Sequence, residues 1–256
     1  MVALQQITNN GISYYQFENL NQLTGVSHGV FTRHAGHSNS PFDSLNIARD
    51  IGDDNCSVEK NRDIIAGCFD NRKLVYASQV HSDRVLVIDS GIPGSPAPLM
   101  GDALVTAMPQ IGLVIQVADC QAVMLVDPDR RVVANVHAGW RGSIKNILGR
   151  TISTMEDRFG CKSRDMVAGI GPALGPCCAE FINFRTEIPD KFWNYKDTWH
   201  HFDFRAISRD QLIASGIRAE KIAISRICTK CNTDLFFSYR GEGKTGRFAA
   251  VIALDA

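Results

Sequence analysis

The amino-acid sequence predicts a layered domain of the α/β or α+β class, in which strand hairpins are combined with a few helices. Short apolar segments separated by turns follow one another as strands over residues 103–106, 112–119, 122–127 and 131–138. Several of them are apolar on both faces, which indicates sheets that are covered on both sides. Residues 143–159 instead repeat their apolar side chains at helical spacing, so they predict an amphipathic helix.

The other elements are expected from the same signals, taken in chain order. Strands are predicted over residues 26–31, 73–80, 84–89, 166–172, 222–227 and 248–254, and helices over 58–69 and 203–215. Ser57 and Ser143 are the expected N-caps of the helices that follow them. A polar loop over 32–46 and a loop rich in proline and glycine over 90–101 connect these elements. Since no linker or repeat interrupts the pattern, residues 1–256 are expected to form one domain.

The composition limits the classes of partner. The chain carries 27 basic and 27 acidic residues and no long run of either sign, so it lacks the electrostatic footprint for nucleic acid or an anionic membrane. No apolar segment is long enough to span a bilayer, and no signal peptide is evident. The eight cysteines are therefore expected to be reduced thiols or metal ligands in a cytoplasmic protein. A small-molecule ligand is compatible with these features, and the sequence leaves the oligomeric state open.

A pair of potential metal ligands stands at one end of a predicted hairpin. Cys120 directly precedes the strand over 122–127, and His137 lies at the end of the strand over 131–138. Antiparallel pairing about the polar turn between these strands brings the two side chains together. His81 also follows a predicted strand, so a His2Cys ligand set is expected. Such a set leaves one position open, as in catalytic zinc sites, and it is equally the core of type-1 copper sites. A buried cysteine with hydrogen-bonded core histidines is the alternative.

Two residues beside this hairpin are candidates for roles in the same site. Asp119, next to Cys120, is expected to support a ligand or act as a general base, or else only to cap a strand end. Arg141 follows the glycine turn after His137, near the start of the predicted helix. An arginine together with free helix N–H groups suits an anion such as phosphate, and an ordinary surface arginine is the alternative.

The cysteines near the C-terminal part of the chain are expected to be buried thiols. Cys228 and Cys231 form a CxxC pair, and Cys177 and Cys178 are adjacent in the sequence. A second, structural metal site built from these four residues is the alternative. It is disfavoured because only one CxxC is present and vicinal cysteines rarely bind the same ion.

A series of motifs runs through nearly the whole chain. In order they are HGVFTRHAG (28–36), PFDSLNIARDIGDD (41–54), QVHSDRV (79–85), GDALVT (101–106), ADCQAVMLVD (118–127), VHAGWRG (136–142), GIGPALGPCCAEF (169–181) and CTKCNTDLFFSYRGEGKTGRFAAVI (228–252). With these motifs the chain resembles the YfiH family, the DUF152 group that is often labelled a laccase domain or polyphenol oxidase. VHAGWRG together with the upstream ADC is the most specific part of the resemblance. Serine after His81 and Arg49 stand where the family commonly has glycine, and neither departure affects a ligand.

The resemblance implies a four-layer α/β/β/α sandwich with mixed β-sheets. It implies a metal ion, usually zinc (Zn²⁺), held by His81, Cys120 and His137, which would also be the catalytic residues. The implied activities are phosphorolysis of adenosine, inosine and methylthioadenosine, and hydrolytic deamination of adenosine. A purine nucleoside and phosphate are therefore the expected small-molecule partners.

Candidates for substrate binding come from two places in the sequence. Arg141 is expected to orient phosphate for attack on the ribose, beside the metal. Arg33 and Asn46 belong to the long polar loop over 32–46, and long ordered loops are often functional. We therefore expect Arg33 and Asn46 to contact the substrate.

Three other functions remain as alternatives. A copper (Cu²⁺) phenol oxidase of the laccase type is disfavoured because the chain has only seven histidines and no His-x-His pair, although a single copper ion at the His2Cys set stays open. A cysteine hydrolase would use Cys120 as its nucleophile and a histidine as its base. A non-catalytic binding domain would turn over no nucleoside.

Overall fold

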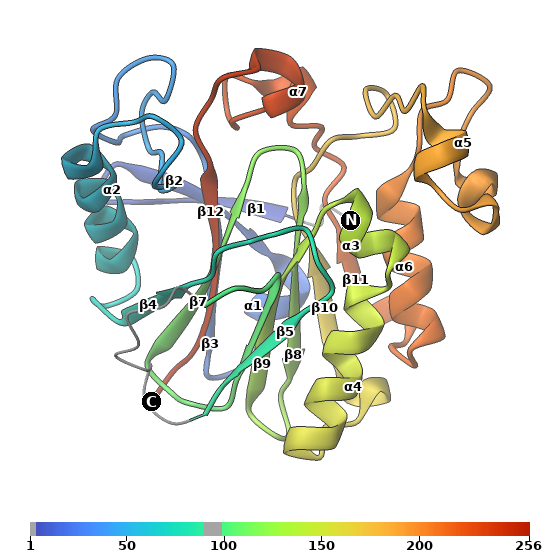
Figure 1. Ribbon diagram of the computed structural model, residues 1–256. Coiled ribbons are helices and arrows are strands. Elements are labelled where there is room, and N and C mark those ends of the chain that lie inside the picture. The colour runs from blue at the N-terminus through green and yellow to red at the C-terminus, as the bar shows by residue number, and fades with distance from the viewer. Residues whose placement is uncertain (1–3, 90–98) are drawn as a thin grey trace.

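The computed structural model describes residues 4–89 and 99–256, which form two six-stranded mixed sheets packed face to face (Figure 1). The first sheet has the strand order β1 (Leu4–Asn9), β2 (Ile12–Phe17), β3 (Val26–Phe31), β12 (Phe248–Leu254), β7 (Ile111–Val117) and β4 (Lys73–Tyr76). The second has the order β11 (Ile222–Ile224), β10 (Val167–Ile170), β8 (Gln121–Asp127), β9 (Val132–Ala138), β6 (Ala103–Thr106) and β5 (Val85–Ile88). The pairs β4–β7, β5–β6 and β10–β11 are parallel, and the other pairs are antiparallel.

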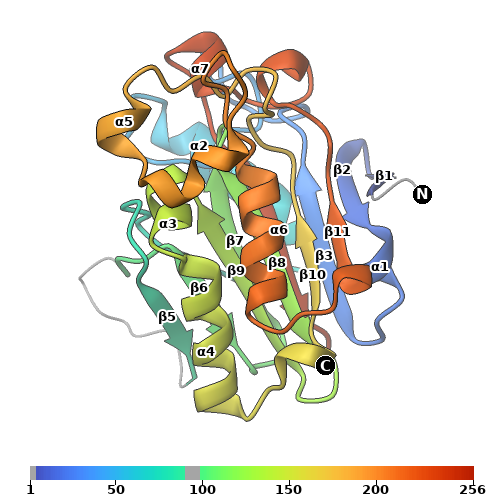
Figure 2. The ribbon, with the colours of Figure 1, turned by 90° about the vertical axis from the view of Figure 1, so that its right-hand side faces the viewer.

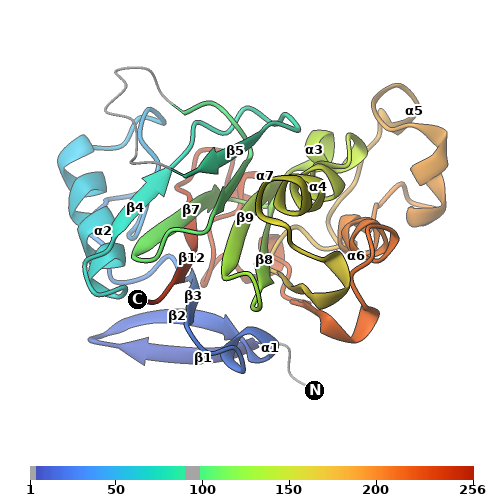
Figure 3. The same cartoon turned by 90° about the horizontal axis from the view of Figure 1, so that it is seen from below.

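Helices cover the outer face of each sheet, as the two turned views show (Figures 2 and 3). The described part of the chain contains the α-helices α1 (Glu18–Asn21), α2 (Asn55–Gly67), α3 (Trp140–Ile144), α4 (Ile147–Phe159), α5 (Phe184–Glu187), α6 (Phe204–Ala214) and α7 (Tyr239–Glu242). α2 packs on the first sheet, while α4 and α6 pack on the second. Within the ranges 4–89 and 99–256, no helix combines the length and the apolar character that crossing a membrane requires.

Alternate side chains of the central strands point into different layers, which is why four layers form. In β8, Met124 and Val126 pack between the two sheets, while Val123 and Leu125 pack against the α4 and α6 side. β12 alternates in the same way, with Val251 on the side of α2. The four-layer α/β/β/α sandwich implied by the family resemblance is thus confirmed, with one apolar core between the sheets and one under the helices of each outer face.

The chain passes from the first sheet to the second between β7 and β8, and this crossing positions the candidate ligands. β8 pairs with β9 so that Gln121 lies opposite Ala138 and Ala122 lies opposite His137. Cys120, one residue before this ladder, therefore shares an edge of the sheet with His137, as the predicted hairpin required. β6, the other neighbour of β9, begins at the same edge, directly after Asp102.

Several boundaries differ from those that the sequence predicts. The β1–β2 hairpin was not predicted, because β1 carries mostly exposed polar side chains (LQQITN) that conceal its strand character. Ser57 is not the cap of α2, because the Asp54 carboxylate accepts the Ser57 N–H at 2.8 Å. The helix predicted over 143–159 is broken at Asn146, which has φ 59° and caps α4. Most of the predicted loop over 90–101 lies outside the described residues.

The two sheets are tied together by a buried amide, which yields a prediction about stability. Asn135 in β9 is fully buried, and its Nδ2 donates to the Leu113 carbonyl of β7 at 2.9 Å and to the Ala250 carbonyl of β12 at 2.8 Å. Asn135→Ala removes two buried hydrogen bonds, each worth about 1 kcal/mol, and leaves a small cavity. We expect the free energy of unfolding in urea to fall by about 2–4 kcal/mol.

The matched control is Ser153→Ala, which alters an exposed position of α4. We expect it to change the free energy of unfolding by less than about 0.5 kcal/mol. An effect of Asn135→Ala as small as that of the control would show that the amide does not hold the sheets together.

Candidate metal centre and substrate pocket

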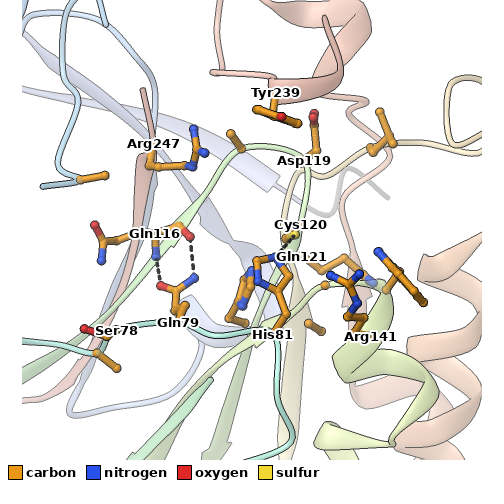
Figure 4. Close-up of a pocket in the computed structure, with 18 of the residues that line it drawn as sticks. Ser78, Gln79, His81, Gln116, Asp119, Cys120, Gln121, Arg141, Tyr239 and Arg247 are labelled. Atoms are coloured by element: carbon orange, nitrogen blue, oxygen red, sulfur yellow. Dashed lines mark hydrogen bonds between the residues drawn. The ribbon is translucent and has the colours of Figure 1, made fainter. Parts of the chain in front are cut away.

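Three side chains from three separate segments meet at one end of the second sheet, where β8 begins and β9 ends. They are His81, in the loop after β4; Cys120, before β8; and His137, near the end of β9. Their ligand atoms all lie within 4.8 Å of one another, and the Cys120 Sγ is 3.8 Å from the His81 Nε2 (Figure 4). The two imidazole rings are nearly perpendicular, with centroids 4.8 Å apart. The His2Cys set expected from the sequence is therefore brought together by the fold.

A buried carboxylate, which the sequence analysis did not single out, orients these ligands. The Asp102 Oδ1 is 2.8 Å from the His137 Nδ1 and accepts the His81 backbone N–H at 2.9 Å. Its Oδ2 accepts the Ser82 N–H and O–H, each at 2.7 Å. Burial acts to raise the pKa of Asp102, but the hydrogen bonds from His137 and Ser82 outweigh it and lower the pKa to about 2. The ionised carboxylate thus requires a proton on Nδ1 of His137, which leaves Nε2 for a metal.

The charge state of the cluster suits a soft divalent cation. Burial would raise the pKa of the Cys120 thiol, but His137 and His81 lower it to about 6, so the sulfur is a thiolate at neutral pH. Burial acts to lower the pKa of His137, and Cys120 and Asp102 raise it to about 9. Once a metal displaces the Nε2 proton of His137, the cluster offers a thiolate and two imidazoles, one of them already oriented by a carboxylate. This donor set fits zinc or copper.

Gly139 allows the ligands to approach this closely. A Cβ at this position would lie 2.9 Å from the His81 Cδ2 and 3.1 Å from the Cys120 Sγ. Real Cβ atoms are not found that close to a ring carbon, so a larger residue would push the two ligands apart. Gly139, the first glycine of the HAGWRG motif, is therefore required because its backbone lies against the ligands, in addition to the turn that it forms before α3.

A cavity of about 930 Å³ opens at the cluster and reaches across the edges of both sheets. The amide of Gln79 forms two hydrogen bonds of 2.8 Å with the backbone of Gln116, on β7, so it fixes this wall of the cavity (Figure 4). Phe181 and Phe204 supply an apolar side, and Tyr239 stands at the opening with 62% of its surface exposed. The cavity thus combines polar and aromatic walls, as ligand sites commonly do.

The lining of the cavity is rich in positive charge. Its arginines are Arg49, Arg62, Arg141, Arg240 and Arg247. Four of these guanidinium groups are held by hydrogen bonds to backbone carbonyls or to Glu59. The guanidinium of Arg141 has no hydrogen bond or ion pair with any described residue and rests on the Trp140 ring, 4.6 Å from its centroid. Arg141 is thus placed beside the cluster with its donors available to an anion.

The structure does not bring Arg33 and Asn46 to this cavity. The Arg33 guanidinium, with the residue only 7% exposed, donates to the carbonyls of Asp43 and Thr233 and to the Glu242 carboxylate. Asn46 is fully buried, and its Oδ1 accepts the backbone N–H of Arg247 at 2.8 Å. These two residues hold together the loops around the cavity. Asn46 therefore contributes to the cavity by positioning Arg247 and Ala48, which line it.

Asp119 is engaged in the same kind of support. It has φ 85°, and its Oδ1 accepts the hydroxyls of Thr229 at 2.6 Å and Ser238 at 2.7 Å. Its Oδ2 accepts the Arg240 N–H at 2.6 Å. The carboxylate thus anchors the segment that leads into α7, and it forms no hydrogen bond with His81, Cys120 or His137. Two of the three roles that the sequence suggested are therefore not seen, since Asp119 neither supports a ligand nor caps its own strand. Its role as a general base stays a prediction, because Asp119 lines the cavity.

Comparison with known proteins places the chain in a family. A family model described as "Multi-copper polyphenol oxidoreductase laccase" matches residues 27–255. The purine nucleoside phosphorylase YlmD of Geobacillus stearothermophilus is 32% identical in an alignment 248 residues long, which covers 90% of this chain and 90% of that protein. The purine nucleoside phosphorylase Cgl2154/cg2365 of Corynebacterium glutamicum is 36% identical in an alignment 233 residues long, which covers 88% of this chain and 93% of that protein.

Solved structures show the same fold over the full length. The crystal structure of YlmD from Geobacillus stearothermophilus has a TM-score of 0.88 at 29% identity and covers 100% of both chains. That of the hypothetical protein YfiH from Bacillus licheniformis has a TM-score of 0.86 at 30% identity and covers 96% of this chain and 100% of its own. With these matches in sequence and in structure, the chain belongs to the laccase-domain (YfiH, DUF152) family.

Proposed function

We propose that the protein is a metal-dependent purine nucleoside phosphorylase whose metal ion, zinc, is held by His81, Cys120 and His137. The observation that carries this proposal is the His2Cys cluster at the wall of a cavity rich in arginine. The names of the relatives as purine nucleoside phosphorylases support the same reaction class. The proposed substrates are adenosine, inosine and methylthioadenosine, and hydrolytic deamination of adenosine is proposed as a second reaction at the same site.

The positions of the charged and aromatic side chains in the cavity suggest which residues bind phosphate and which bind the purine. Arg141 is the proposed phosphate ligand, because its guanidinium lies beside the cluster and forms no hydrogen bond or ion pair with any described residue. The Gln116 side chain and Tyr239, on the opposite wall and at the opening, are the proposed contacts to the purine. A volume of about 930 Å³ accommodates a nucleoside together with phosphate.

The reaction attaches an oxygen of hydrogen phosphate to C1′ of the ribose while the bond from C1′ to the purine nitrogen breaks. The proton that hydrogen phosphate loses balances the one that the departing purine takes up. A metal ion held by the three ligands would supply a Lewis acid that stabilises negative charge in the transition state. Arg141 orients the attacking phosphate, and the aromatic walls limit access of water to C1′. Asp102 keeps the His137 Nδ1 protonated, so that Nε2 stays available throughout the reaction.

A cysteine hydrolase is the second candidate, because one specific observation favours it. Cys120, His137 and Asp102 form a chain in which a thiolate faces a histidine whose Nδ1 is bound to a buried carboxylate. This order resembles a nucleophile, a base and an orienting acid. Against it stands His81, whose Nε2 is also directed at the sulfur and which such a triad does not need. Inactivation by thiol alkylation together with insensitivity to chelators would favour the hydrolase.

Copper at the same ligands is the other variant of the proposal. The family description names a multi-copper laccase, but the described residues contain a single group of three metal ligands that includes histidine. A trinuclear copper centre needs many more histidines than this group provides. Stoichiometric copper and an intense blue colour in protein purified without added metal would replace zinc in the proposal.

Substitution of Cys120 tests whether the proposed residues bind the metal. In Cys120→Ala, the metal content is expected to fall by about one ion per chain, and release of adenine from adenosine in phosphate buffer to fall by about a thousandfold, because the loss of a Lewis acid costs several kcal/mol. Chromatography of the products and elemental analysis give the two readouts. Cys56→Ala, which alters an exposed cysteine of α2, is the matched control and should leave both unchanged. Equal activities of Cys120→Ala and the unaltered protein would refute the assigned centre.

The second prediction concerns phosphate. Arg141→Ala is expected to raise the KM for phosphate about 10- to 100-fold, because a hydrogen bond to a charged group contributes about 1.5–3 kcal/mol. Arg141→Lys should recover part of this loss, and the KM for the nucleoside should change less. Arg164→Ala removes an exposed arginine outside the cavity and serves as the control. An unchanged KM for phosphate in Arg141→Ala would exclude this residue as the phosphate ligand.

The third prediction concerns the pH dependence of metal binding. The pKa of His137 is raised to about 9, so below that pH the metal must displace a proton from the imidazole. The pKa of Cys120 is lowered to about 6, so a second proton is displaced below pH 6. Metal affinity should therefore rise roughly tenfold per pH unit between about 6 and 9, and more steeply below 6. Competition with a chelator at several pH values measures this slope, and a flat profile between 6 and 9 would contradict it.

A further inference from the structure

A second cluster of sulfur atoms lies outside the centre described above. The Sγ atoms of Cys177, Cys178, Cys228 and Cys231 all lie within 4.8 Å of one another. The Cys231 Sγ is 3.7 Å from that of Cys177 and 3.5 Å from that of Cys178. The sequence led us to expect buried thiols, and this expectation is wrong for Cys177 and Cys231, which are exposed. Burial of apolar thiols therefore does not explain why the four gather.

The spacing of the sulfur atoms is that of a mononuclear metal site. A zinc–sulfur bond is about 2.3 Å long, so the edge of a regular ZnS₄ tetrahedron is about 3.8 Å. A disulfide bond, at about 2.0 Å, is far shorter than the observed contacts. An iron–sulfur cluster spreads its four thiolates over two or more iron atoms and therefore needs a wider cage. The close approach of four cysteines thus points to one tetrahedral ion.

The backbone around the cluster is arranged to receive thiolates. A β-bridge joins Ala173 to Cys228, and the Gly175 N–H donates to the Cys228 Sγ at 3.2 Å. A Cβ on Gly175 would lie 3.2 Å from the Cys177 Sγ, so the glycine keeps the backbone close to the sulfur atoms. An N–H group that donates to sulfur favours its ionised form. The two segments that carry the cysteines are thus held in register without any bond between the sulfurs.

A buried cation lies next to the cluster. Arg205, only 7% exposed, donates through its Nη2 to the carbonyls of Ala173 and Ile227 at 2.6 and 2.7 Å. Its Nε is buried and has no hydrogen-bond partner among the described residues. The guanidinium interacts electrostatically with Cys228, Asp203 and Cys177. Four thiolates around a divalent ion carry a net charge of −2. A guanidinium at this position offsets part of that charge.

We propose that Cys177, Cys178, Cys228 and Cys231 bind a zinc ion in a closed, structural site. Four thiolates leave no position open for a substrate, so the ion would act as a link between chain segments. It joins the segment that carries Leu174 and Phe181 to the segment that leads into Tyr239, and all three of these residues line the cavity. The second ion thereby fixes the walls of the nucleoside pocket without taking part in the chemistry.

The experiment counts metal ions in four proteins purified under reducing conditions. We expect about two zinc ions per chain in the unaltered protein and in the control Cys56→Ser. One ion is expected in Cys120→Ala, which keeps the second cluster, and one in the double variant C178S/C231S, which keeps the first. The double variant should also show a higher KM for the nucleoside and a smaller change in kcat. The metal count does not depend on enzyme activity. It therefore tests the second metal site even if the proposed function is wrong.

A second readout covers the case in which the double variant does not fold. Cobalt loaded into Cys120→Ala should give the intense visible bands and sulfur-to-metal charge transfer of tetrahedral thiolate coordination. Absence of these bands, or zinc content that drops to zero in Cys120→Ala, would overturn the proposal. Thiol titration of the unaltered protein, denatured and freed of metal, should find all eight cysteine thiols. Recovery of only six would mean that two of these cysteines form a disulfide, which also overturns it.

Discussion

The ionised carboxylate of Asp102 is the interaction on which the candidate active centre depends. The three ligands lie on three segments that are far apart in the sequence. Hydrogen bonds within the β8–β9 hairpin therefore cannot align all of them. Asp102, at the start of β6, binds the His137 ring and the backbone at His81 with the same oxygen. A buried carboxylate is costly unless every lone pair is used. Four short hydrogen bonds satisfy it, and through them this one group links the His137 ring to the segment that carries His81.

The cavity owes its position to the way the two sheets are connected. The chain leaves β7 in one sheet and enters β8 in the other within three residues, so Asp119 and Cys120 stand where the sheets meet. Asp119 uses its carboxylate to hold the segment before α7, while Cys120 points into the cluster. Of these two adjacent residues, Asp119 thus stabilises the wall of the site and Cys120 belongs to the ligand cluster. The walls come from loops at the sheet edge, where long side chains such as Arg141 and Tyr239 are not confined by a core.

The sequence predicted those parts of the site that depend on local pairing. The hairpin of β8 and β9 follows from a polar turn between apolar strands, so the proximity of Cys120 and His137 was predictable. Asp102 was not, because a carboxylate before a strand is usually a solvated end residue, and only the tertiary fold buries it. Arg33 and Asn46 were assigned to substrate because loop polarity does not reveal whether a side chain faces solvent or the loop's own backbone. The β1–β2 hairpin was missed since its polar edge strand lacks apolar alternation.

The two names attached to the family can be weighed by the chemistry of the donors. Electron transfer through several copper ions needs clustered histidines, and the described residues gather two histidines at one cluster and none at the other. Five arginines around the cavity would attract an anion, which a phenol oxidase does not need. A single ion beside an anion-binding wall instead suits the transfer of a group to phosphate. The charge distribution of the pocket, rather than the ligand set alone, therefore favours phosphorolysis over oxidation.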